Sequence, residues 1–310
     1  MERLWSVIQV VLPVISALVL GWAVRRKCIM TERGMSEMKN LLVNICLPAV
    51  LFSTFCNMQF SWREAVLFFT MAGVTLIAFL LGFAARRILG MEQPVSPWLC
   101  TTIEGGSIGY ALFILLFGQG NLYHLALLDA GNALVQWSLV MSLLAARMGG
   151  QKSRKETLRS LVTPINTAIV LGLLFSVTGW GARLAAGGGG KALLSALEFI
   201  GTPVSALIMM SVGFGMTFAH VDWKETGKAV AARACIFAVL GCAVSTLAGR
   251  IFADDMLYRN AALVFFILPP TFAYSVYVRR KEDSAFLSGY LAVYTLLTVA
   301  AFTVLAAFLR

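Results

Sequence analysis

Apolar residues run along this chain in long stretches that short polar segments separate. Because a helix needs roughly 20 apolar residues to cross the hydrocarbon core of a bilayer, each stretch predicts one membrane-spanning helix. The pattern therefore predicts an all-α polytopic membrane protein with ten transmembrane helices. The expected spans cover residues 4–24, 37–57, 64–85, 97–118, 122–146, 160–180, 192–217, 227–250, 258–278 and 284–309.

The composition excludes other broad classes of protein. Hydrophobic residues make up 59% of the 310 residues and charged residues 13%, whereas soluble domains carry roughly 25% charged residues. A chain this apolar is expected to be neither soluble nor disordered. The formal net charge of +10 does not indicate nucleic-acid binding, because the basic residues form short clusters between apolar stretches. The lipid bilayer is the expected environment.

The basic clusters predict the orientation in the membrane. They follow the expected spans 1, 3, 5, 7 and 9, at residues 25–27, 86–87, 147–159, 224–228 and 279–281. Lys and Arg are concentrated in cytoplasmic loops, so these loops are expected in the cytoplasm and both termini outside.

An internal repeat divides the chain into two halves. The segment from Pro13 to Gly21 matches the segment from Pro164 to Gly172 at five of nine positions, and Trp223-Lys-Glu answers Trp62-Arg-Glu. We expect five-span halves over residues 1–147 and 160–310, joined by a cytoplasmic linker over 148–159. Since five is odd, the halves are inverted relative to each other, as in many secondary transporters. The alternative is gene duplication in a purely structural membrane protein.

Helix-breaking residues fall at matching places in spans 4 and 9. Three glycines (Gly105, Gly106 and Gly109) weaken span 4, and Pro269 and Pro270 interrupt span 9. Paired interruptions near the middle of the membrane point to a substrate site whose half-helix amides favour anions. The alternative is an ordinary kink without a ligand. The expected substrate-binding residues are Gly105, Gly106, Ser107, Gly109, Tyr110, Pro269, Pro270 and Thr271.

Four polar residues inside the spans are candidates for coupling or support. Glu104 and Asp129 are carboxylates that the bilayer disfavours unless they find a partner or a proton. Asn44 and Asn132 are amides expected to be buried, where they bridge helices or touch a ligand. The alternatives are a loop-end position for Glu104 and a purely structural hydrogen bond for Asp129.

The sequence shows no pattern typical of an enzyme. It has no Ser/His/Asp constellation, no HExxH motif, no CxxC pair and only two histidines. The glycine run at 187–190 lacks the Lys-Ser/Thr of a phosphate loop, and we expect it to be a flexible link. No cofactor or metal is expected, and H⁺ or Na⁺ is the candidate coupling ion.

Four segments together resemble the auxin efflux carrier family, the PIN-like permeases. They are residues 42–53, with Asn44 and Pro48; residues 106–118, which are rich in glycine; residues 129–137, beginning at Asp129; and residues 269–277, beginning with two prolines. The family usually has a proline after the glycine of span 4, where this chain has Tyr110. An asparagine that often precedes that glycine is also missing. These departures leave room for a different substrate.

The resemblance implies a fold like the bile acid sodium symporters, with a scaffold bundle, a transport bundle and spans 4 and 9 crossing at their breaks. Members move organic anions, which are auxin in plants and dicarboxylates such as malate or malonate in bacteria. The short linker is similar to the bacterial branch, which implies the cell (inner) membrane, and a homodimer through the scaffold bundle is a candidate assembly.

The expected function is therefore secondary active transport of a small organic anion by alternating access. A sodium- or proton-coupled cation exchanger on the same architecture is the alternative. A non-transporting membrane sensor and an intramembrane enzyme are further classes that the sequence favours less.

Overall fold

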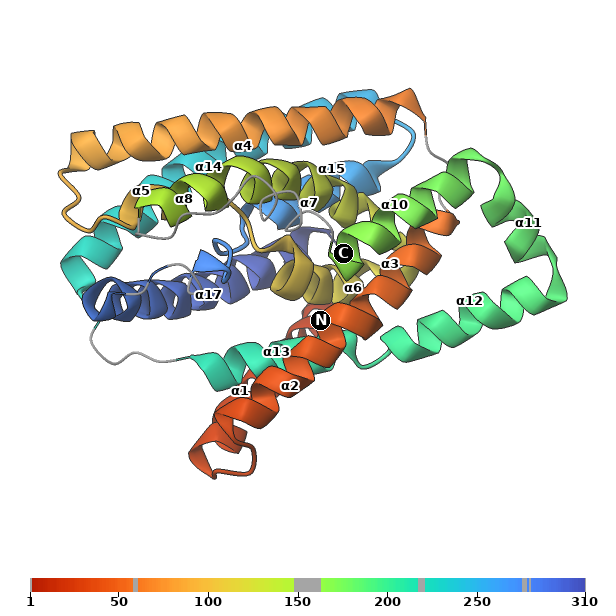
Figure 1. The fold of residues 1–310 in the computed structure, drawn as a ribbon, viewed down its shortest axis with the longest axis horizontal. Coiled ribbons are helices and arrows are strands. Elements are labelled where there is room, and N and C mark those ends of the chain that lie inside the picture. The colour runs from red at the N-terminus through yellow and green to blue at the C-terminus, as the bar shows by residue number, and fades with distance from the viewer. Residues whose placement is uncertain are drawn as a thin grey trace.

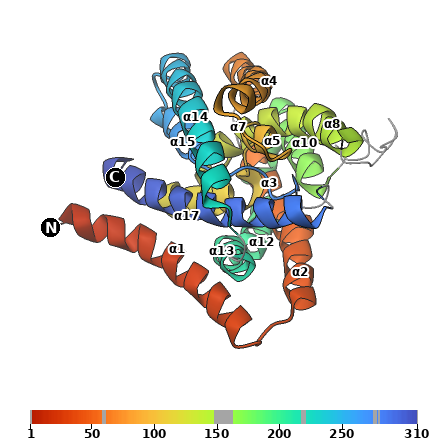
Figure 2. The same cartoon turned by 90° about the vertical axis from the view of Figure 1, so that its left-hand side faces the viewer.

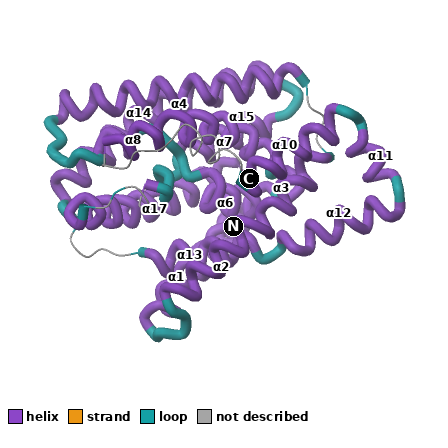
Figure 3. Tube along the Cα trace, viewed as in Figure 1, coloured by secondary structure: helices purple, strands orange, loops and turns teal. Residues whose placement is uncertain are grey.

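The computed structural model describes residues 2–57, 61–147, 163–216, 221–274, 278 and 280–309. Every regular element in these ranges is helical (Figure 3). The first half contains α1 (Glu2–Arg26), α2 (Glu32–Leu41), η1 (Leu42–Cys46), α3 (Leu47–Cys56), α4 (Trp62–Leu89), α5 (Ser96–Leu99), η2 (Gly105–Gly109), α6 (Tyr110–Phe117), η3 (Gln119–Asn121), α7 (Tyr123–Val135), η4 (Gln136–Val140) and α8 (Met141–Arg147). The second contains α10 (Pro164–Val177), α11 (Trp180–Ala186), α12 (Gly188–Gly201), α13 (Val204–Gly215), α14 (Trp223–Ile251), α15 (Met256–Phe266) and α17 (Lys281–Leu309).

Six helical stretches are long and apolar enough to cross a membrane. They cover Glu32–Cys56, Trp62–Leu89, Tyr123–Leu144, Gly188–Gly215, Trp223–Ile251 and Glu282–Leu309. A seventh is added if α10 and α11, which are bent by 85° at their junction, are counted as one span. The expected spans 4 and 9 are interrupted, so neither contains a single helix long enough to cross a membrane. The number ten therefore stays a prediction.

The two Trp-x-Glu segments of the repeat begin the long helices α4 and α14. Ser61 and Glu64 form a capping box, in which the Ser61 amide donates to Glu64 Oε2 over 2.7 Å. Asp222 caps α14 by accepting from the amides of Lys224 and Glu225, each over 3.1 Å. These contacts satisfy amides that a helix start leaves without partners. At these two positions, the sequence resemblance between the halves therefore reflects N-terminal caps on corresponding helices.

The helices form two packing groups. In one group α1 contacts α13, and α3 contacts α10 and α12. In the other, α4 contacts α7 and α14, while α15 contacts α7 and α14. Helix α17 lies between the groups and contacts α1 on one side and α14 on the other (Figure 1 and Figure 2).

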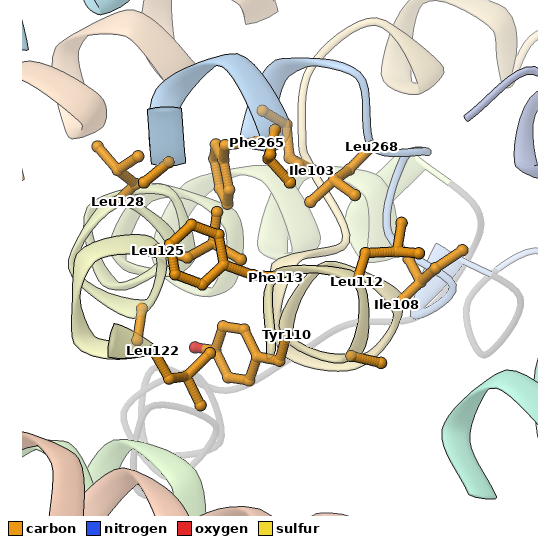
Figure 4. Packing of buried hydrophobic residues seen from close by; sticks show 14 of the residues in the cluster. Ile103, Ile108, Tyr110, Leu112, Phe113, Leu122, Leu125, Leu128, Phe265 and Leu268 are labelled. Carbon is orange, nitrogen blue, oxygen red and sulfur yellow. The ribbon is translucent and has the colours of Figure 1, made fainter. Parts of the chain in front are cut away.

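A buried apolar cluster fixes the second part of span 4. Phe113 of α6 lies among Leu125 and Leu128 of α7 and Phe265 at the end of α15, and all four are fully buried (Figure 4). Burying each such side chain contributes roughly 1.5–3 kcal/mol. This packing holds α6 against α7 and against the end of α15, and so it sets the position of both helix breaks.

One expectation about a connecting segment is wrong, and another is outside the described ranges. The glycine run is not a flexible link, because Gly188 begins α12 and Gly187 is its N-cap residue. The three glycines that follow the cap take helical conformation as the start of a fourteen-residue helix. The expected linker over 148–159 lies outside the described residues.

Candidate functional site

Two helix breaks face each other at the centre of the structure. In the expected span 4, α5 ends at Leu99, residues 100–104 are irregular, and helix resumes at Gly105. In the expected span 9, α15 ends at Phe266 and no helix is present over 267–273. The break in span 4 thus lies before the glycines and not within them, which corrects the sequence-based placement. The reason is that the backbone just before the glycines, at Glu104, is hydrogen-bonded to Pro269 of span 9 instead of to its own helix.

Glu104 joins the two breaks with its main chain and its side chain. Its amide donates to the carbonyl of Pro269 over 2.9 Å. Its carboxylate atom Oε2 accepts from Thr271 Oγ1 over 2.9 Å and from the amide of Phe272 over 2.8 Å. The carboxylate therefore satisfies an amide donor that the interrupted segment cannot satisfy within a helix.

Asp129 of α7 lies directly over the backbone at Gly105. A Cβ atom at Gly105 would lie 2.3 Å from Asp129 Cγ, so only glycine leaves room for the carboxyl group. The Tyr110 hydroxyl donates to Asp129 Oδ2 over 3.0 Å, and Asn132 Nδ2 lies 3.4 Å from Oδ1. Asp129 is thus buried but hydrogen-bonded, beside the start of the second half of span 4.

A chain of buried polar side chains continues from Asp129 to Glu104. Asn132 Nδ2 donates to the carbonyl of Ile103 over 3.1 Å and lies 3.4 Å from Gln136 Oε1. Gln136 Nε2 donates to Thr271 Oγ1 over 3.1 Å, and Thr271 donates onward to Glu104. Spans 4, 5 and 9 are therefore connected by one hydrogen-bonded network, in which a change at one carboxylate alters the partners of the other.

Arg233 of α14 donates hydrogen bonds to backbone carbonyls in both breaks. Its side chain is fully buried, and NH1 donates to the carbonyls of Leu99 and Thr102 over 2.5 and 2.9 Å. NH2 donates to the carbonyl of Leu268 over 3.0 Å. A cation is favourable there because the C-terminal end of a helix carries partial negative charge. A charged residue inside an apolar span is itself a pointer to a functional position, and Arg233 is not among the site residues predicted from the sequence.

Two cavities adjoin the crossing, with volumes of about 370 and 250 Å³. Val43, Glu104 and Phe272 line both of them. The larger cavity is bounded mainly by η1, α13 and α17, and its polar lining residues are Lys39, Glu104, Ser211, Ser288 and Thr295. The smaller one is bounded mainly by α7, η4 and the start of α10, together with both breaks.

The structure brings most of the expected site residues together. The lining of the smaller cavity includes Glu104, Gly105, Gly106, Asp129 and Thr271. The remaining members, which lie next to the crossing without lining either cavity, are Gly109, Tyr110, Asn132, Pro269 and Pro270. Ser107 is part of η2, and its side chain lies outside the described residues. Their role in binding stays a prediction.

Asn44 is not part of this site. Its side chain is exposed and donates to the carbonyl of Asn40, one turn earlier in its own helix, over 2.8 Å. The expectation of a buried, bridging amide is therefore wrong, because the π-helical turn η1 places Leu42 and Cys46 inward instead. Gln136 and Phe272, which sequence reasoning did not select, are nearer to the crossing.

Glu104 and Asp129 are the acidic residues that line the two cavities at the crossing, among the residues that the structure describes. Across the same ranges there is no group of three or more His, Cys, Asp or Glu residues that could hold a metal ion. The site offers two carboxylates, several hydroxyl and amide oxygens, and one Lys at the larger cavity. This set of groups suits a small polar solute together with a proton or a monovalent cation.

The long apolar helices around two joined breaks define a multi-pass membrane protein with a transporter-like interior. No family model matches the chain. A curated relative from Methanothermobacter thermautotrophicus, named an uncharacterized transporter, is 24% identical over 220 residues, which cover 68% of this chain and 68% of the relative. The similarity agrees with a transporter-like protein and fits a protein that is not an enzyme. It does not specify the auxin efflux carrier family.

Proposed function

We propose that the protein is a secondary transporter of a small organic anion and that Glu104 and Asp129 couple its movement to a cation. The observation that carries this proposal is the position of Glu104. It belongs to one break, is hydrogen-bonded to the other, and lines both cavities. A solute in either cavity therefore meets the same carboxylate.

Both cavities lie toward the side that the basic loops predict to be cytoplasmic. The larger is lined by Lys39 near the start of the second span, Gly215 at the end of α13 and Ser288 near the start of α17. The smaller is lined by Asn166 in the first turn of α10. These helix ends adjoin the Lys- and Arg-rich segments, so we propose that this conformation faces inward.

Alternating access would follow from movement of the two packing groups relative to each other. The crosswise contacts of α1 with α13 and of α3 with α10 support a two-fold relation between the halves, because the first span of each half meets the second span of the other. Five spans in each half would make that relation an inverted one. The group containing α4, α7, α14 and α15 carries the crossing and would act as the transport bundle. The group containing α1, α3, α10 and α13 would act as the scaffold.

Electrostatics require a coupling cation if the substrate is an anion. Two like charges 4 Å apart repel by roughly 4 kcal/mol at an effective dielectric constant of 20. The charge of Arg233 is directed to backbone carbonyls, and Lys39 is the cation that lines the larger cavity. A proton or Na⁺ at the carboxylates would remove the repulsion, and the empty site would bind that cation first.

The paired carboxylates also favour a second candidate, a cation exchanger. In that case Glu104 and Asp129 would bind the transported ion, and the cavities would carry no organic substrate. The two functions predict different ligands for the same residues, so ligand binding separates them.

A thermal-shift experiment on the purified protein tests the proposal. A ligand that binds the folded state at one hundred times its Kd stabilises it by about 2.7 kcal/mol. We expect malate, malonate or indole-3-acetate to raise Tm in the wild type only when the coupling cation is present. In Glu104→Gln, which lacks one repelling charge, the rise should depend less on that cation, and Glu37→Gln, which alters an exposed carboxylate on α2, should behave like the wild type. Stabilisation by NaCl over choline chloride, with no effect of any organic acid, would contradict anion transport and favour the exchanger.

A further inference from the structure

Another cavity, of about 670 Å³, lies at the C-terminal end of α4 and is separate from the two cavities at the crossing. It is formed where the end of α4 meets Gly90 and Met91 and the last residue of α8. Its lining combines three arginines with apolar side chains, and consists of Leu80, Phe83, Ala84, Arg86, Arg87, Gly90, Met91 and Arg147.

The three arginines have no acidic partner among the described residues. Arg86 Nε donates to the carbonyl of Met91 over 3.2 Å. The guanidinium group of Arg147 lies 5.4 Å from the ring centroid of Phe83 and 6.0 Å from that of Trp98. These contacts position two of the cations without neutralising their charge, because an aromatic face and a carbonyl supply only partial negative charge.

Two acidic residues beside the Gly90–Met91 turn are directed elsewhere or lie outside the lining. Glu225 accepts from Lys228 Nζ over 2.7 Å and from the amide of Glu92 over 2.9 Å. The side chain of Glu92 is exposed and does not line the cavity. The cavity therefore presents three cationic groups that an anionic ligand can contact.

The apolar part of the lining indicates an amphiphilic ligand. Leu80, Phe83 and Ala84 extend from the arginines back along α4, which is one of the helices apolar enough to cross a membrane. The arginines follow at the end that the distribution of basic residues predicts to be cytoplasmic. A phospholipid presents the same sequence of chemistry, with a phosphate at the surface and acyl chains beneath it.

We propose that this cavity binds the phosphate headgroup of an anionic phospholipid of the cytoplasmic leaflet. Arg86, Arg87 and Arg147 contact the phosphate, and the apolar residues of α4 contact the start of the acyl chains. Because α4 belongs to the group that carries the crossing, and α8 contacts η4, which contacts α7 of the same group, the bound lipid connects that group to the membrane surface.

Native mass spectrometry and thermal unfolding of the detergent-purified full chain test this site. The probes are phosphatidylglycerol, phosphatidylcholine as the zwitterionic lipid, and inorganic phosphate. The test variant is Arg86→Gln/Arg87→Gln/Arg147→Gln. The matched control is Arg26→Gln/Lys27→Gln/Lys224→Gln, which removes the same charge from exposed positions on the same predicted side.

We expect phosphatidylglycerol to bind and to raise Tm in the wild type and in the control, with phosphatidylcholine having little effect. Binding should weaken about five-fold for each arginine removed, the equivalent of about 1 kcal/mol per basic residue. If the triple variant does not fold, the single variant Arg87→Gln, at an exposed position, replaces it with the same expected five-fold change.

Three results would overturn the proposal. Equal binding of phosphatidylglycerol and phosphatidylcholine would show that charge does not select the lipid. An equal loss of binding in the control variant would show a diffuse effect of surface charge. A rise in Tm with inorganic phosphate that matches the rise with phosphatidylglycerol would assign the site to a soluble anion.

Discussion

Glu104 and Pro269 belong to different halves of the chain, yet the amide of Glu104 donates a 2.9 Å hydrogen bond to the carbonyl of Pro269. The amide and the carbonyl both lie in non-helical segments. Each therefore serves as the hydrogen-bond partner that a continuous helix would have supplied to the other. The two breaks therefore stabilise each other. A change in one break should alter the conformation of the other, and this dependence underlies the predictions that follow.

Replacing Thr271 tests the polar network that joins the breaks. Thr271→Val keeps the shape of the side chain but removes the hydroxyl that accepts from Gln136 and donates to Glu104. Leaving such buried groups without a partner costs about 1–3 kcal/mol, so we expect a lower Tm together with reduced ligand stabilisation. The control is Thr246→Val on α14, an exposed position bonded only to the carbonyl of Cys242. Equal effects of the two substitutions would contradict a special role for Thr271.

The adjacent glycines Gly105 and Gly106 provide a matched pair. In Gly105→Ala the new Cβ would lie 2.3 Å from Asp129 Cγ and would force the carboxyl group to move. In Gly106→Ala the nearest atom is Asp129 Oδ2 at 3.7 Å, which is an ordinary contact. We therefore expect Gly105→Ala to reduce transport at least about ten-fold, the equivalent of 1.4 kcal/mol, and Gly106→Ala to retain most of it. Radiolabelled uptake into proteoliposomes measures both, and similar activities would show that the position of Asp129 is unimportant.

Arg233 is expected to matter chiefly for stability. Arg233→Met leaves three buried carbonyls without their donors, and at 1–3 kcal/mol for each group the loss should be about 3 kcal/mol or more. Arg250→Met alters an exposed residue of the same helix and should change Tm little. Differential scanning fluorimetry of both purified variants makes the comparison. A Tm for Arg233→Met equal to that of the wild type would contradict the proposal that Arg233 stabilises the two breaks.

Neutralising Glu104 should separate binding of the coupling cation from folding. Glu104→Gln retains an oxygen that accepts from Thr271 and Phe272, but the hydrogen bonds lose their charge and about half their strength. We expect the variant to insert and fold with a modest loss of Tm, and its remaining uptake to become insensitive to the imposed cation gradient. Uptake that responds to the gradient as in the wild type would exclude Glu104 as the coupling group.

The sequence predicts the helical class, the positions of the long helices and the two interrupted segments, because these depend on apolar length and on Gly and Pro. It does not place the break in span 4 correctly. Gly105 is required for the approach of Asp129 and not for the irregular backbone, and the bond between Glu104 and Pro269 joins residues far apart in the sequence. Such a contact leaves no local pattern.

Burial of single polar residues was only partly predictable. Asp129 and Asn132 follow the rule that polar groups within spans face inward, whereas Asn44 bonds to its own helix and remains exposed. The difference depends on η1, a π-helical turn that rotates the helix face and has no clear sequence signature. Arg233 carried a usable signal, since a lone cation in an apolar span needs buried acceptors.

Gradient-driven uptake of radiolabelled malonate into proteoliposomes, compared between wild type and Asp129→Asn, tests the proposed function most directly. An inward proton gradient and an inward sodium gradient are imposed separately, with protein-free liposomes as the blank. We predict that one gradient drives uptake by the wild type and that Asp129→Asn, although correctly inserted, loses most of this response. Full gradient-driven uptake by Asp129→Asn would contradict coupling at the crossing of the two breaks.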